Sequence, residues 1–165
     1  MTIFQHLKLA LTALLGIAML GGCQTAPTPA RFTAAQVEVL RDHRFVDTGD
    51  GWELSMADRL LFDTDSALLR PEFNTALDRI ADGLLRVGID GARVEGHTDS
   101  TGSSDHNARL SAARAAAIAA ALIDHGFAPT RVAQHGWGET RPVAENNDPE
   151  GRQLNRRVVI IVTAG

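Results

Sequence analysis

Two long stretches of the chain carry apolar residues at the three- and four-residue spacing of an amphipathic helix. In the first, residues 71–87, the repeated apolar positions are Phe73, Leu77, Ile80, Leu84 and Leu85. In the second, residues 104–125, they are Leu110, Ala113, Ala117, Ala121 and Leu122. Pro71 suits a first helical turn, and Gly88 and Gly126 suit helix ends. We therefore predict two main helices over these ranges.

Other segments have the shorter apolar patterns of β-strands. They are residues 45–54, 92–97, 131–135 and 158–162. The first of them should be a hairpin, because Asp50-Gly51 is a strong turn signal, and its second strand should extend to residues 60–62. Residues 158–162 are all Val or Ile, which favours a strand in the middle of a sheet, buried on both faces.

A short helix over residues 34–41, capped by Thr33, completes the predicted elements. Residues 139–151 are mostly polar and contain two prolines, so we expect a loop there. The order of elements is hairpin, helix, strand, helix, strand, strand. This order is typical of an α+β fold, a two-layer sandwich with two main helices on one face of the sheet, here with an added N-terminal helix.

Residues 1–22 have the pattern of a lipoprotein signal peptide. Their apolar run, residues 9–20, is shorter than the roughly 20 residues that a membrane-spanning helix needs. The small residues before Cys23 resemble the lipobox of bacterial lipoproteins, which implies a lipidated Cys23 followed by a tether over residues 23–33. Gln24 after the cysteine implies sorting to the outer membrane. The alternative is that Cys23 is a buried free thiol.

Composition narrows the class of partner. Removing the signal peptide takes away Lys8, the only lysine, and leaves 15 arginines against 20 acidic residues, a net charge of −5. Such a chain is a poor partner for nucleic acid, because phosphate binding requires a basic surface. Residues 23–165 are enough for one domain. Nothing in the composition calls for a cofactor.

A charged pair at a predicted strand-to-helix junction is the clearest candidate site. Asp99 follows the strand 92–97, and Arg114 lies in the early part of the helix 104–125. A strand end and the first turns of the next helix lie close in space, so the two groups can face one ligand that carries an ammonium and a carboxylate. The free N–H groups at the start of the helix add an anion site. Taken alone, the spacing fits a structural salt bridge between Asp99 and Arg114 equally well.

Motifs spread over residues 53–163 resemble the OmpA-like C-terminal domain, which also occurs in Pal lipoproteins and flagellar stator proteins. The motifs are Gly96-His97-Thr98-Asp99, Asn107, Leu110-Ser111, Arg114-Ala115, Gly136-Trp137-Gly138-Glu139 and Asn155-Arg156-Arg157-Val158. The resemblance assigns residues 53–165 to this domain. It implies a mixed four-stranded sheet in the order 1-4-2-3, with strand 4 antiparallel.

The same resemblance implies non-covalent binding of peptidoglycan through the diaminopimelate of uncrosslinked stem peptides. Asp99 and Arg114 would be the central pair, which receives the ammonium and the carboxylate of the ligand. The resemblance implies further site residues, namely Phe62, Asp63, Thr98, Gly102, Asn107 and Leu110.

Residues 34–52 resemble a signalling subgroup of this family. Its members are outer-membrane lipoproteins that sequester a YfiR-like periplasmic repressor, which releases a diguanylate cyclase and raises cyclic-di-GMP. The resemblance implies a partner-binding role for Leu40, Phe45 and Trp52, although the same residues fit a packed core equally well. Residues 63–65 depart from the subgroup and are closer to the general family. The alternative is a structural tether of the Pal type between the outer membrane and the cell wall.

Catalysis and metal binding have little support in the sequence. The acids that would suit glycan hydrolysis are Asp63, Asp65, Glu95 and Asp99. The chain has no Gly-x-Ser-x-Gly motif, and His97 and His106 lack further ligands at a recognised spacing. We therefore predict a binding protein with no enzymatic activity and no metal. Asn155 and Arg156 are expected to hold the loop 139–151, and the alternative is that Arg156 and Arg157 contact carboxylates of the ligand or the wall.

Overall fold

The structure is a computed structural model, and it describes residues 32–164. The predicted signal peptide (1–22), the lipidation site Cys23 and nearly all of the predicted tether (23–33) lie outside the described residues. Within 32–164, no helix is both long enough and apolar enough to cross a membrane.

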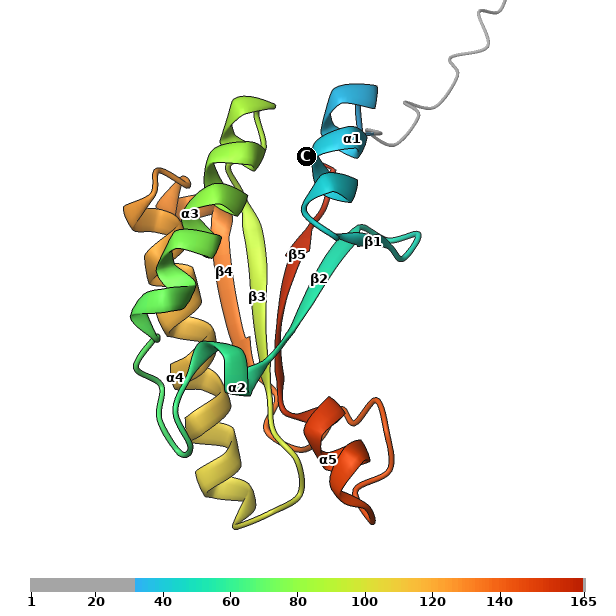
Figure 1. The fold of residues 1–165 in the computed structure, drawn as a ribbon, viewed down its shortest axis with the longest axis vertical. Coiled ribbons are helices and arrows are strands. Elements are labelled where there is room, and N and C mark those ends of the chain that lie inside the picture. Colours follow the sequence, from blue (N-terminus) through green and yellow to red (C-terminus); the bar gives the residue numbers. More distant parts are fainter. Residues whose placement is uncertain (1–31, 165) are drawn as a thin grey trace, which may run out of the picture.

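The described residues form a five-stranded sheet in the order β1-β2-β5-β3-β4. The strands are β1 (Val46–Asp47), β2 (Trp52–Ala57), β3 (Ala92–His97), β4 (Val132–Gly136) and β5 (Arg157–Val162). The helices are α1 (Ala34–Asp42), α2 (Asp58–Leu61), α3 (Pro71–Arg86), α4 (Ser104–Asp124), the short 3-10 helix η1 (Pro129–Arg131) and α5 (Pro149–Asn155). Figure 1 shows α3 and α4 side by side on one face of the sheet, with α1 and α5 at its two ends. The predicted two-layer α+β class and the two main helices are confirmed.

The predicted strand order holds for four strands but is one strand short. β5 pairs antiparallel with β2 and with β3, and β3 pairs parallel with β4, which gives the order 1-4-2-3 for the four longer strands. The fifth strand, β1, is the first arm of the Asp50-Gly51 hairpin and pairs Val46 with Glu53. The hairpin predicted over residues 45–54 includes this arm and is confirmed, so only the four-strand count implied by the family resemblance was short.

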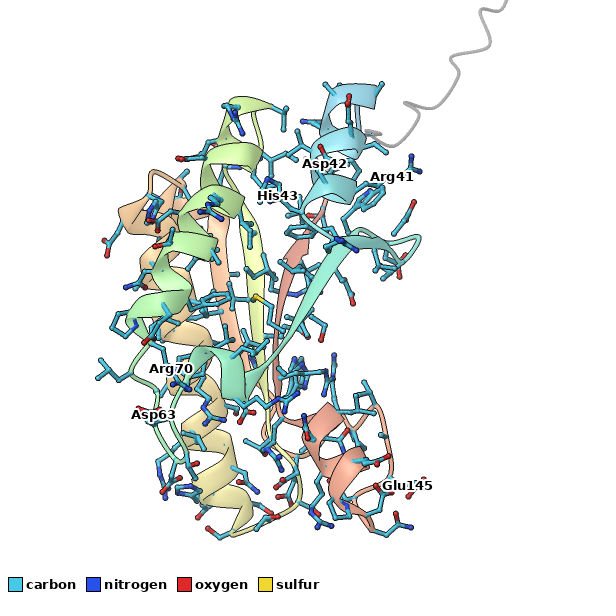
Figure 2. The ribbon with its side chains drawn as sticks, viewed as in Figure 1. Arg41, Asp42, His43, Asp63, Arg70 and Glu145 are labelled. Atoms are coloured by element: carbon cyan, nitrogen blue, oxygen red, sulfur yellow. The ribbon has the colours of Figure 1, made fainter. Side chains whose placement is uncertain are left out.

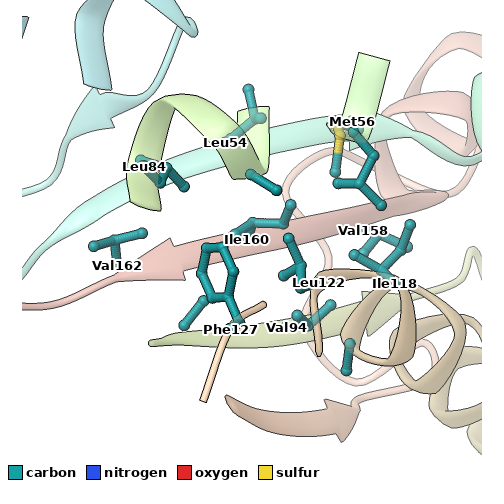
Figure 3. Close-up of a cluster of buried hydrophobic side chains, with 14 of the residues drawn as sticks. Leu54, Met56, Leu84, Val94, Ile118, Leu122, Phe127, Val158, Ile160 and Val162 are labelled. Carbon is teal, nitrogen blue, oxygen red and sulfur yellow. The ribbon is translucent and has the colours of Figure 1, made fainter. Parts of the chain in front are cut away.

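The core lies between the sheet and the pair α3 and α4 (Figure 3). Ile160 on β5 is the register partner of Leu54 on β2 and of Val94 on β3, so these three side chains form one row across the sheet. The predicted burial of the Val-Ile strand on both faces is confirmed, because every residue from Val158 to Val162 is buried.

Two glycines let α4 approach the sheet closely. A Cβ atom on Gly96 of β3 would lie 2.1 Å from the backbone oxygen of Ser111, and one on Gly136 of β4 would lie 2.3 Å from the backbone nitrogen of Ala112. Atoms cannot approach so closely without moving. These positions therefore set the distance between α4 and the strands that carry the site.

Two local predictions were wrong. Residues 60–62 do not extend the strand, because the chain turns at Asp58 into the short helix α2, whose last turn is closed by the Phe62 N–H donating to the Asp58 carbonyl at 2.8 Å. The polar segment 139–151 contains the start of α5, which Asp148 caps by accepting from the Gly151 N–H. Neither helix is long enough to show a helical apolar period.

The N-terminal segment packs against the domain. Thr33 and Gln36 form a capping box at the start of α1, and Gln36 also donates to the Val87 carbonyl at the end of α3. The three residues with an implied partner-binding role, Leu40, Phe45 and Trp52, are all buried in the core. In this conformation a partner cannot reach them, so their proposed role requires the segment to move away.

Candidate ligand-binding site

A pocket of about 650 Å³ opens where α2, the loop after β3, the start of α4 and the end of α5 meet. All eight residues that the sequence assigned to the site line this pocket, namely Phe62, Asp63, Thr98, Asp99, Gly102, Asn107, Leu110 and Arg114. Residues from four separate segments therefore converge there.

Arg114 is held rigidly in the wall of the pocket, with 3% of the residue exposed. Its Nε donates to the Ser66 carbonyl at 2.9 Å, and its Nη1 donates to the Asp58 carboxylate at 2.8 Å. The guanidinium also stacks 5.2 Å from the centre of the Phe62 ring. Within the described range its Nη2 has no hydrogen-bond partner. This nitrogen is the donor that Arg114 can offer to a ligand.

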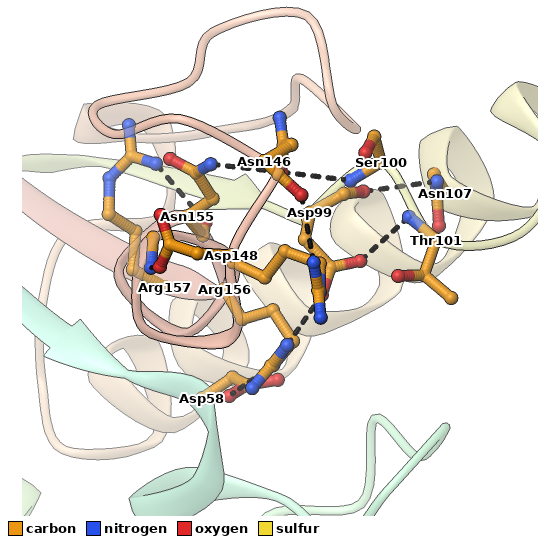
Figure 4. A network of polar contacts seen from close by, with 12 residues as sticks. Asp58, Asp99, Ser100, Thr101, Asn107, Asn146, Asp148, Asn155, Arg156 and Arg157 are labelled. Carbon is orange, nitrogen blue, oxygen red and sulfur yellow. Dashed lines mark hydrogen bonds and ion pairs between the residues drawn. The ribbon is translucent and has the colours of Figure 1, made fainter.

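Asp99 is likewise buried, with 5% of the residue exposed, and it is held by two donors (Figure 4). The Thr101 N–H donates to its Oδ1 at 2.8 Å, and Arg156 Nη1 donates to its Oδ2 at 2.5 Å. Burial alone raises the pKa of Asp99, but the hydrogen bonds from Thr101 and Arg156 outweigh burial and bring the pKa below its ordinary value. Asp99 is therefore a carboxylate at neutral pH.

Asp99 and Arg114 do not form the direct salt bridge that the sequence left open. Each has its own counter-ion, Arg156 for Asp99 and Asp58 for Arg114. Asp58 also lies 3.8 Å from the Arg156 guanidinium, so the four groups alternate in charge along one chain of contacts. We call this set, Arg114–Asp58–Arg156–Asp99, the charge chain.

The two inner members of the charge chain, Asp58 and Arg156, were not among the predicted site residues. The sequence predicted a strand region over Asp58, and the burial of this acid is visible only in the structure. Arg156 was expected to support the loop 139–151, with contact to a ligand as the alternative, and its side chain lines the pocket. Asn155 does support the loop as expected, because its Oδ1 accepts from the N–H groups of Val143 and Ala144.

The start of α4 forms the floor beside Asp99. Ser103 caps the helix by accepting from the His106 N–H, and Gly102 reaches this cap with a positive φ of 93°. Asn107 donates through Nδ2 to the Asp99 carbonyl at 3.2 Å and to Glu139 at 2.5 Å. The hydroxyl of Thr98 is buried and has no partner among the residues described. These contacts fix the loop that carries Asp99.

The rim of the pocket is charged but open to solvent. Arg70 lies 3.8 Å from Asp63 (Figure 2), and His106 lies 2.7 Å from Asp65. The Asp63 side chain is 79% exposed. Because water screens exposed ion pairs, the pairs of the rim are weaker than those of the charge chain, whose members are more buried.

Of the four acids considered for catalysis, Asp63, Asp65 and Asp99 line the pocket and Glu95 does not. Glu95 points to the other face of β3 from the core residue Val94 and is paired with Arg93 at 2.9 Å, and it does not line the pocket. Among residues 32–164, no group of three metal-ligating side chains comes together. The remaining acids line a pocket whose strongest donors are arginines.

His97, next to the site, is buried and uncharged. Burial first, and then the charge of Arg157, lower the pKa of His97 from 6.5 to about 4, although Glu95 lies 3.7 Å away. The unfolded chain therefore binds a proton at His97 more readily than the folded chain does. The stability that neutral His97 contributes is complete above about pH 6.5 and is lost as the pH falls towards 4.

Comparison with known proteins gives a family match over most of the residues that line the pocket. A family model described as "OmpA family" matches residues 61–156. The outer-membrane lipoprotein YfiB of Pseudomonas aeruginosa is 41% identical over 159 residues, which cover 96% of this chain and 93% of that protein.

Solved structures are similar as well. The cell wall anchor of the T6SS from Pseudomonas aeruginosa has a TM-score of 0.67 at 33% identity, covering 84% of this chain and 100% of that one. The peptidoglycan-associated lipoprotein from Burkholderia pseudomallei has a TM-score of 0.56 at 27% identity, covering 63% of this chain and 88% of that one.

Proposed function

Since the chain belongs to the OmpA family, as its motifs led us to expect, we propose that its pocket binds peptidoglycan non-covalently through the diaminopimelate of uncrosslinked stem peptides. The chain is an OmpA-like, peptidoglycan-associated lipoprotein. The similarity to an outer-membrane lipoprotein over 96% of the chain also supports the expected location, with the domain in the periplasm.

One observation carries the proposal: a buried carboxylate and a buried guanidinium line one pocket without neutralising each other. The ligand carboxylate would bind Arg114 Nη2. The ligand ammonium would bind Asp99, which is ionised at neutral pH. A diaminopimelate side chain carries both charges at one carbon.

The direct test is co-sedimentation with purified sacculi. Asp99→Asn is expected to weaken binding at least roughly tenfold, because a charged hydrogen bond contributes about 1.5–3 kcal/mol and the amide still accepts from Thr101. Asp124→Asn makes the same charge change at an exposed position at the end of α4 and should bind like the wild type. Equal binding of both variants would contradict the site, and release of soluble muropeptides would contradict a non-enzymatic role.

We further propose that the N-terminal segment captures a YfiR-like periplasmic repressor when it leaves the domain, and that this raises cyclic-di-GMP through a diguanylate cyclase. The similarity to YfiB supports this role, since it extends over α1 and β1. Release would expose Leu40, Phe45 and Trp52, which are buried while the segment is docked. The alternative remains a structural tether of the Pal type.

Deletion of residues 31–52 separates the two roles. A signalling protein is expected to keep its binding to sacculi, which also reports a folded domain, while losing repressor binding in a pull-down and lowering cellular cyclic-di-GMP. A structural tether would leave cyclic-di-GMP unchanged, since its function depends on the anchor and the wall-binding domain alone.

A further inference from the structure

The charge chain contains two residues that do not fit a simple ligand-binding pair. Asp58, with 7% of the residue exposed, puts a fixed negative charge beside Arg114, and Arg156 puts a fixed positive charge beside Asp99. Asp58 repels the ligand carboxylate that Arg114 would attract, and Arg156 repels the ligand ammonium that Asp99 would attract. A pocket evolved for a simple anion or a simple cation would gain by losing one of them.

The repulsion between Asp58 and a ligand carboxylate at Arg114 is strong because the two would lie close together. Asp58 occupies Nη1 at 2.8 Å, and the free Nη2 belongs to the same guanidinium. A ligand oxygen on Nη2 would therefore lie on the order of 5 Å from the Asp58 carboxylate. At an effective dielectric constant of about 20, like charges at such a distance reduce affinity by roughly tenfold or more.

At Asp99, the repulsion is between Arg156 and a ligand ammonium. Arg156 occupies Oδ2, and the Thr101 N–H occupies Oδ1, so an approaching ammonium meets the Arg156 charge at close range. The two ends are connected, because Asp58 and Arg156 contact each other at 3.8 Å. The four charges sum to zero, and the exposed ion pairs of the rim are screened by water.

We infer that Asp58 and Arg156 are specificity-determining residues that restrict the pocket to zwitterions. A lone anion is attracted by Arg114 but repelled by Asp58, and a lone cation is attracted by Asp99 but repelled by Arg156. A zwitterion places its carboxylate at Arg114 and its ammonium at Asp99. Its carboxylate then also attracts Arg156, and its ammonium also attracts Asp58. These two attractions offset the two repulsions. The inference rests on the proposed function and explains how the pocket would select its ligand.

Three small probes, which differ in the charged groups that they carry, test this inference. They are meso-diaminopimelate, pimelate, which lacks both amino groups, and 1,5-diaminopentane, which lacks both carboxylates. In NMR titrations of the full domain, the wild type is expected to prefer diaminopimelate over either other probe. Asp58→Asn keeps an acceptor for Arg114 and should raise the affinity for pimelate roughly tenfold without raising that for diaminopentane. Arg156→Gln should raise the affinity for 1,5-diaminopentane roughly tenfold without raising that for pimelate.

Asp124→Asn, the matched charge control, should leave the ranking of the three probes unchanged. Should Asp58→Asn fail to fold, Asp58→Ser supplies a neutral acceptor at the same place. A purely structural role for Asp58 would lower the affinity for all three probes together and would overturn the inference. Wild-type protein that binds pimelate as tightly as diaminopimelate would overturn it while leaving wall binding intact. Wild-type protein that binds neither sacculi nor diaminopimelate would overturn both.

Discussion

Replacing Arg114 by leucine should abolish binding to sacculi and lower the free energy of unfolding by about 3–5 kcal/mol. The binding loss follows because Nη2 of Arg114 is the donor available to the ligand carboxylate. The stability loss follows because Asp58, which is 7% exposed, stays buried but loses its donor at 2.8 Å. Urea unfolding measures the second effect, and co-sedimentation with sacculi measures the first.

The double variant Arg114→Leu/Asp58→Leu separates the two effects. Replacing both members of a buried ion pair with apolar groups is often neutral for stability. We therefore expect the double variant to recover most of the lost stability and still not to bind. If Arg114→Leu alone retained wild-type binding to sacculi, Arg114 would have no role in the site, however much stability it contributes.

The second large effect is expected from Gly96→Ala on β3, which should destabilise the domain by about 3 kcal/mol or more. The added Cβ would lie 2.1 Å from the backbone oxygen of Ser111. That oxygen belongs to α4, so it cannot rotate away as a side chain would, and the helix must shift. Because α4 carries Asn107 and Arg114, the shift should weaken binding to sacculi as well.

Gln134→Ala on the neighbouring strand β4 is the control for Gly96→Ala. Gln134 is exposed, so a change of side chain there meets no backbone atom, and stability should stay within about 0.5 kcal/mol of the wild type. Thermal unfolding followed by circular dichroism compares the two. A Gly96→Ala variant as stable as the control would show that α4 does not need this close approach.

The long elements could be predicted because their patterns are repeated many times. The helices over 71–87 and 104–125 were expected within one residue of α3 and α4, and the Val-Ile run of β5 was expected in the middle of the sheet. In each case several residues point to the same period. The helices α2 and α5 are too short for such repetition, and they were missed.

The residue types of the site could also be read from the sequence, but their partners could not. Asp99 and Arg114 were identified from a motif and from the proximity of a strand end to the next helix. Asp58 is 56 positions from Arg114, and Arg156 is 57 positions from Asp99. No local pattern relates residues so far apart, since only the pairing of β5 with β2 and β3 brings them together.

For this protein, the order of apolar and polar positions was sufficient to determine the layers, the two main helices and the buried central strand, and the motifs over residues 53–163 were sufficient to indicate the family. The tertiary structure alone decided which charges face each other in the pocket and that Leu40, Phe45 and Trp52 are packed in the core. The physical reason is range: periodicity acts between neighbours in the chain, whereas ion pairing and burial act between neighbours in space.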